Sequence, residues 1–198
     1  AGSGGGTVNP TFPPRLAAKD ASGDDPAAPR VIMNSFYWKP PFKPEHEEHY
    51  LASMFETHIG PEDYPGDMVP SANWPMVAPG KFGMNNALAP IYQPPIEKLY
   101  GIASKPPVLW IHGVDDQIVG DMSFFEMGTL GKLGAVPGWP GEDVYPPQPM
   151  KAQTRAVLEK YQAAGGETRE VAIAEAGHTP YVEKPAEFDA AFHAWIQR

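Results

Sequence analysis

The stretch from Pro106 to Val119 reads Pro-Pro-Val-Leu-Trp-Ile-His-Gly-Val-Asp-Asp-Gln-Ile-Val and decides the fold class. Its apolar run, roughly Val108 to His112, is bounded by proline and glycine, a pattern typical of a buried strand in a parallel sheet. Two aspartates follow the strand at its carboxyl end, where α/β sheets place their functional side chains. The stretch therefore predicts an α/β fold with chemistry at this strand end.

A helix, a second strand and a last helix are expected after this stretch. A Gly- and Pro-rich connection from Gly128 to Pro149 leads into a helix that Gly165-Gly166 ends, because glycine is common just past a helix. Thr168 to Ala174 is the next expected strand, and Pro185 suits the first position of the last helix. The helical positions are apolar at helical spacing: Met150, Val157, Leu158 and Tyr161, then Phe188, Phe192, Trp195 and Ile196. This order predicts a βαβα unit with a right-handed parallel crossover.

Two strands of this kind are too few to form a stable sheet. A parallel pair needs neighbouring strands to satisfy its backbone edges, and an exposed apolar edge would invite aggregation. We therefore expect another chain to complete the sheet. The first six residues, Ala-Gly-Ser-Gly-Gly-Gly, fit a linker, a natural loop or a new end made by cleavage. Cleavage of one precursor before Ala1 is the expected source of two chains, and self-cleavage is disfavoured because Ala1 has no nucleophilic side chain.

An acid and a base are expected at the same edge of the sheet. Asp116 follows the first strand, and His178 follows the second in Gly-His-Thr-Pro. Because adjacent parallel strands end at one edge, the turns after them can bring a carboxylate within hydrogen-bond reach of an imidazole. Asp115 is a competing acid, whereas Asp121 and Asp143 fall outside the turn and are weaker candidates. Packing of a turn by His178 and capping of a turn by Asp116 remain the structural alternative.

Together these segments resemble the C-terminal part of the α/β-hydrolase family, over about Pro106 to Arg198. The family acid follows a Gly-x-x-Asp turn, which begins here at Gly113, and a Gly-His pair precedes its last helix. Glu183 and Pro185 follow His178 at the family spacing. The resemblance implies that His178 is the general base and that Asp116 fixes its tautomer. No Gly-x-Ser-x-Gly elbow occurs in the sequence, so the nucleophile and the oxyanion hole are expected on the second chain.

Three segments are predicted along the chain. Residues 1–30 are expected to be a flexible N-terminal segment with at most a short helix. Residues 31–105, rich in proline and aromatic side chains, are expected to be a loop-rich cap or lid. One amphipathic helix is predicted there after Pro44, ended by Gly60-Pro61. Residues 106–198 are expected to be the C-terminal part of the α/β-hydrolase core.

The predicted function is hydrolysis of an ester, lactone or amide bond by a Ser-His-Asp type triad shared between two chains. The expected partner is the N-terminal chain of the same hydrolase, and the expected substrate is a small apolar or aromatic molecule. Trp38 and Ile118 are candidates for substrate contact, because ligand sites are mostly apolar. A dehalogenase or epoxide hydrolase on the same fold would use the same acid and histidine. A non-catalytic binding protein of this fold is a third alternative.

Charge and composition argue against several other classes. The formal charge of −9 opposes binding to nucleic acid or an anionic membrane, and no apolar run approaches the roughly 20 residues of a membrane span. There are no cysteines, which excludes disulfides and thiolate metal sites. His46, His49 and His58 lack an evident third-ligand arrangement, so no metal and no cofactor are expected. We expect a soluble protein; its compartment stays open, with the cytoplasm slightly favoured.

Overall fold

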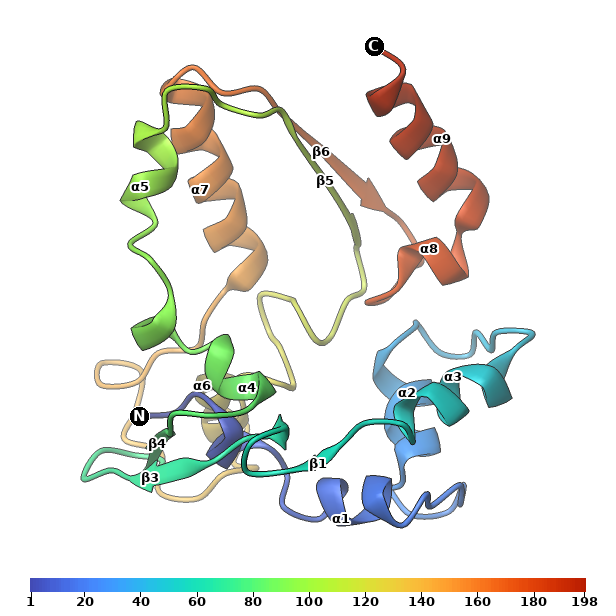
Figure 1. Ribbon diagram of the computed structural model, residues 1–198, viewed down its shortest axis with the longest axis vertical. Coiled ribbons are helices and arrows are strands. Elements are labelled where there is room, and N and C mark those ends of the chain that lie inside the picture. Colours follow the sequence, from blue (N-terminus) through green and yellow to red (C-terminus); the bar gives the residue numbers. More distant parts are fainter. The chain divides into compact units, whose positions relative to one another are not determined.

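The computed structural model describes all residues from 1 to 198 and is a mixed α/β structure with small parallel and antiparallel sheets (Figure 1). Its residues separate into two compact units, described one at a time below. Unit 1 comprises Ala1–Met33, Glu45–Gln93 and Glu126–Pro147, and unit 2 comprises Asn34–Pro44, Pro94–Phe125 and Gln148–Arg198. The predicted segment boundaries at residues 30 and 105 are not the boundaries of these units, because both the expected cap and the expected core contribute to each.

Unit 1 consists of short helices and two small sheets. β1 pairs with β2 in parallel, and β3 pairs with β4 in antiparallel orientation. Its elements are η1 (Gly5–Thr7), α1 (Phe12–Ala17), α2 (Pro29–Phe36, ending in unit 2), α3 (Glu47–Met54), β1 (Ile59–Gly60), β2 (Tyr64–Pro65), β3 (Met68–Pro70), β4 (Val77–Pro79), α4 (Met84–Ala87), η2 (Pro90–Tyr92) and α6 (Met127–Lys132). The helix predicted after Pro44 is present as α3, but it ends at Met54 and not at Gly60-Pro61, because Ile59 and Gly60 form β1.

The N-terminal glycines are packed within unit 1. The Gly5 amide donates a hydrogen bond to Oδ1 of the buried Asn86 at 2.9 Å, and the Gly2 amide donates to the Val77 carbonyl at 3.0 Å. A Cβ on Gly4, whose φ is +86°, would lie 2.2 Å from Asn86 Oδ1. Glycine at this position therefore permits close packing, a role different from the flexibility expected from composition.

Unit 2 contains the predicted βαβα unit. β5 (Val108–Gly113) and β6 (Thr168–Ile173) pair in parallel, in register from Val108 with Thr168 to Gly113 with Ile173. The helices of the unit are α5 (Glu97–Gly101), α7 (Met150–Ala163), α8 (Pro180–Glu183) and α9 (Pro185–Ile196). In Figure 1 the strand pair runs between α7 and α9. Because the two strands are parallel, their carboxyl ends lie at the same edge of the sheet.

The β5–β6 pair is only partly covered. In β5 the side chains from Val108 to Ile111 are half-buried, and only His112 and Gly113 are buried. In β6 Ile173 is the buried residue, while Arg169, Glu170 and Ala172 are exposed. A parallel pair at the centre of an α/β sheet would be buried on both faces.

None of the helices in residues 1–198 has both the length and the apolar character needed to cross a bilayer.

Candidate functional site

Asp116 and His178 form a hydrogen-bonded pair just beyond the carboxyl ends of β5 and β6. His178 Nδ1 lies 3.0 Å from Asp116 Oδ2. Because an ionised carboxylate only accepts hydrogen bonds, Nδ1 carries the proton in this contact. Nε2 of the neutral ring then has a free lone pair. The imidazole is 36% exposed, whereas the Asp116 side chain is 6% exposed.

The Asp116 carboxylate is held by its own turn as well as by His178. Its Oδ1 accepts hydrogen bonds from the amides of Ile118 at 2.8 Å and Val119 at 2.9 Å. Burial opposes ionisation of this carboxyl, but the hydrogen bonds from His178 and the two amides outweigh burial, so the pKa of Asp116 lies below its ordinary value. Asp116 is therefore a preoriented anion that can stabilise a positively charged imidazole.

Glycine allows the two turns to touch. A Cβ on Gly113 would lie 2.0 Å from the Gly177 carbonyl oxygen and 2.3 Å from the Ala176 carbonyl oxygen. The Asp115 amide donates to that same Ala176 oxygen at 2.9 Å. A side chain at Gly113 would push the turns apart, so the absence of a Cβ lets Asp116 reach His178.

Glu183 fixes the backbone just before His178. Its side chain is 7% exposed, and its two oxygens accept from the amides of Gly177 and Lys39, each at 2.7 Å. Burial raises the pKa of Glu183, although the amide donors partly offset this effect. Thr179 also donates its hydroxyl to the Tyr37 carbonyl at 2.8 Å. The histidine turn is thus anchored on both sides.

The competing acid Asp115 is occupied elsewhere. Its Oδ2 pairs with Lys39 Nζ at 3.0 Å, and the same ammonium contacts Glu175 at 2.5 Å. Asp115 makes no hydrogen bond to His178 within residues 1–198, whereas Asp116 does. The geometry therefore favours Asp116 as the acid partner. Asp121 caps α7 by accepting from the Ala152 amide at 2.9 Å.

Lys151 lies beneath the Asp116 turn and was not among the predicted site residues. It is the second residue of α7 and is 7% exposed. Its ammonium donates to the carbonyls of Gly113 at 2.7 Å and Val114 at 2.9 Å. Burial lowers the pKa of Lys151. The one hint in the sequence is a cation in the first turn of a helix, where the helix dipole disfavours it.

Comparison of the chain with protein-family models, with curated proteins and with solved structures finds no match.

The two candidate substrate residues differ in their surroundings. Trp38 is 2% exposed, its Nε1 donates to Asn34 Oδ1 at 3.1 Å, and its ring packs edge-on against Phe42. This packing is that of a core residue and leaves the ring closed to a ligand. Ile118 is half-buried in the acid turn, next to Val119, which is 37% exposed. Ile118 lies in the acid turn itself, and its amide donates to Asp116, whereas Trp38 packs its backbone against Gly177, the residue before His178.

The structure contains no hydroxyl nucleophile bonded to His178 Nε2. Ser123, the serine that follows the acid turn, is fully buried and donates its hydroxyl to the Ile118 carbonyl at 2.6 Å. The pair thus provides an acid and a base, and no hydrogen bond within unit 2 joins a hydroxyl group to Nε2 of that base.

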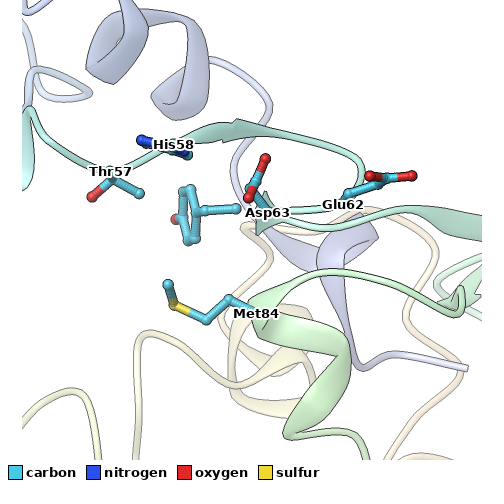
Figure 2. A pocket seen from close by; sticks show the side chains of 6 residues that line it. Thr57, His58, Glu62, Asp63 and Met84 are labelled. Carbon is cyan, nitrogen blue, oxygen red and sulfur yellow. The ribbon is translucent and has the colours of Figure 1, made fainter.

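Neither the two histidines at the start of α3 nor a hollow in unit 1 forms a metal site or a second acid–base pair. His46 and His49 stack with ring centroids 5.4 Å apart, and residues 1–198 contain no group of three side chains placed to hold a metal ion. An open hollow of about 360 Å³ lies in unit 1, and its lining side chains are Thr57, His58, Glu62, Asp63, Tyr64 and Met84 (Figure 2). None of the hydrogen bonds described here joins His58 to an acid in that hollow.

Proposed function

We propose that this chain supplies the general base, His178, and its acid partner, Asp116, to a hydrolase of the α/β-hydrolase type that acts on ester, lactone or amide bonds. A second chain supplies the nucleophile and the oxyanion hole. The observation that carries the proposal is the 3.0 Å contact between His178 Nδ1 and a buried aspartate held by two backbone amides.

The chemistry of the pair supports a role as a base. With Nδ1 donating to Asp116, the ring presents Nε2 as a proton acceptor on its partly exposed side chain. A hydroxyl brought to Nε2 would lose its proton to the ring while it attacks a carbonyl carbon. Asp116, ionised at neutral pH, would stabilise the imidazolium that forms, and the ring would then return the proton to the leaving group.

The incomplete sheet supports the second chain. β5 and β6 form a two-stranded sheet, and such a pair has unpaired backbone groups at its outer edges. Apolar side chains before and after the acid are also exposed, namely Val114, Met122, Phe124 and Phe125. Exposed apolar surface of this kind marks protein or ligand contact. We place the nucleophile-bearing chain against this edge and a small apolar or aromatic substrate beside Ile118.

The test is turnover of an aryl ester by the complex purified with this chain. We expect His178→Ala to abolish turnover and Asp116→Asn to lower kcat about 10³- to 10⁴-fold, because the amide favours the wrong tautomer of the ring. Asp121→Asn is the matched control, since it removes the same charge from a carboxylate that caps α7. Full activity of His178→Ala would refute the assignment. Ligand binding without turnover in the wild-type complex would instead favour a binding protein.

A further inference from the structure

Lys151 occupies an unusual place for a lysine. Lysine is almost never buried without a partner, yet the Lys151 side chain is 7% exposed and belongs to none of the ion pairs of the structure. Its ammonium instead donates to two backbone carbonyls, those of Gly113 and Val114. These carbonyls lie at the carboxyl end of β5 and in the first residue of the turn that carries Asp116.

The charges around Lys151 are mostly negative. The carboxylates of Asp116, Asp121 and Asp115 all favour its protonated form, while Arg155 on the next turn of α7 opposes it. Asp115 already pairs with Lys39 and Asp121 caps α7, so Asp116 is the carboxylate of this group that bonds to the histidine. The Lys151 ammonium therefore holds the backbone through hydrogen bonds, and its positive charge favours the ionised form of Asp116.

We propose that Lys151 is a positioning residue for the Asp116–His178 pair: its buried ammonium clamps the carbonyls of Gly113 and Val114 and favours the ionised form of Asp116. This inference rests on the proposed function of that pair. Lys151 makes no hydrogen bond to His178 in this role; it acts through the turn and through the charge of Asp116.

The two hydrogen bonds from Lys151 hold the backbone at the point where the acid turn and the histidine turn meet. Gly113 is the residue whose missing Cβ lets the turns approach, and Val114 donates its amide to the Ile173 carbonyl of β6 at 2.9 Å. Two donors from one ammonium fix the orientation of both peptide planes that precede Asp115. Loss of the donors would remove the hydrogen bond to the Val114 carbonyl and weaken the hold on the Gly113 carbonyl, which also accepts from the Asp116 amide at 3.5 Å.

The experiment compares Lys151→Met with wild type by NMR on the purified 198-residue protein. Methionine has nearly the length of lysine but lacks its charge and its donors. We expect the downfield proton resonance of His178 Nδ1–H to be lost or broadened. The Ile118 and Val119 amides, which bond to Asp116, should exchange at least about tenfold faster. The carboxyl resonance of Asp116 should titrate at higher pH, because a nearby positive charge has been removed.

Lys160→Met is the matched control, since Lys160 is an exposed lysine on the same helix. It should leave all three signals unchanged. In the active complex, Lys151→Met should lower kcat with little change in KM, and Lys151→Arg, which retains charge and donors, should restore part of the activity.

Unchanged His178 and Asp116 signals in a folded Lys151→Met protein would overturn the proposal. If that variant does not fold, titration of the wild-type protein decides instead: the Asp116 carboxyl resonance must respond as Lys151 loses its proton, and a flat response overturns the proposal. These signals need no nucleophile. A disturbed pair in a protein that hydrolyses no ester would therefore count against the proposed function and leave the positioning role intact.

Discussion

Replacement of Gly113 by alanine should separate the two turns that bear the acid and the base. The added Cβ would lie 2.0 Å from the Gly177 carbonyl oxygen, whereas ordinary contact begins near 3.4 Å. The three nearest atoms, in Gly177 and Ala176, all belong to the backbone, so no side chain can rotate away. The turns must therefore move apart by more than an ångström, which is beyond what the 2.9 Å bond from Asp115 to Ala176 and the 3.0 Å bond from His178 to Asp116 can absorb.

The expected loss can be worked from these contacts. Two hydrogen bonds contribute roughly 1 kcal/mol each, and overpacking of a tight backbone contact costs about 1–3 kcal/mol. Gly113→Ala should then lower the free energy of unfolding by roughly 3–5 kcal/mol. It should also abolish the His178 Nδ1–H resonance and the esterase activity of the complex.

Urea unfolding together with NMR of the histidine resonance measures both effects. Gly101→Ala is the control, because Gly101 also lies in unit 2 and has no atom within 4 Å of an added Cβ. Its unfolding free energy should stay within about 0.5 kcal/mol of wild type. If Gly113→Ala behaves like Gly101→Ala and retains the histidine resonance, the close approach of the two turns does not hold the pair together.

Two further substitutions test the carboxylates of the site. Since the folded pKa of Asp116 lies below its ordinary value of 3.8, its ionised form stabilises the fold above that pH, and this stabilisation is lost as the pH falls through the folded pKa. Asp116→Asn should therefore reduce unfolding free energy most near neutral pH and least in acid, and a pH-independent difference in urea titrations would contradict this. Glu183→Gln places an NH₂ group against one of two backbone donors and should cost about 1–3 kcal/mol. Burial raises the folded pKa of Glu183 above its ordinary value of 4.5, so the contribution of Glu183 to the free energy of unfolding falls as the pH rises through that folded pKa. Glu183→Gln should remove this pH dependence. The same pH dependence in wild type and variant would argue against the burial effect.

The βαβα unit could be predicted because its signals are local. β5 and β6 are apolar or alternating runs that end at turn residues, and α7 and α9 carry apolar side chains at helical spacing. Proline and glycine mark their ends. The order of the elements then dictates a parallel pair, which the structure confirms.

Unit 1 was less predictable because its order depends on contacts distant in sequence. β3 and β4 have three residues each, too few for a periodic pattern. The Asn86 side chain instead links α4 to Gly5, Asp67 and Phe82 through four hydrogen bonds. α6 lies inside the connection expected to be irregular, and Glu126 starts it by accepting from the Gly128 and Thr129 amides.

That an acid after β5 meets His178 could be predicted from strand order, because parallel strands present their carboxyl ends together, and the choice of Asp116 over Asp115 came from the family resemblance. The supports of this contact were harder to predict. Lys151 lies 35 residues beyond Asp116 in the sequence and bonds to backbone atoms, and its position in the first turn of a helix is the one hint of this role. Glu183 could be named from its spacing, whereas its bond to the Lys39 amide joins residues 144 apart.

Intact mass spectrometry under denaturing conditions, after the native protein has reacted with a fluorophosphonate ester, measures whether the triad is shared between two chains. A shared triad predicts a second chain that gains the mass of the reagent on a serine, while this chain gains none. It also predicts that the His178→Ala variant leaves the partner unlabelled. If this chain is found alone, folded and unlabelled, the claim that its acid and base serve a nucleophile on another chain is wrong.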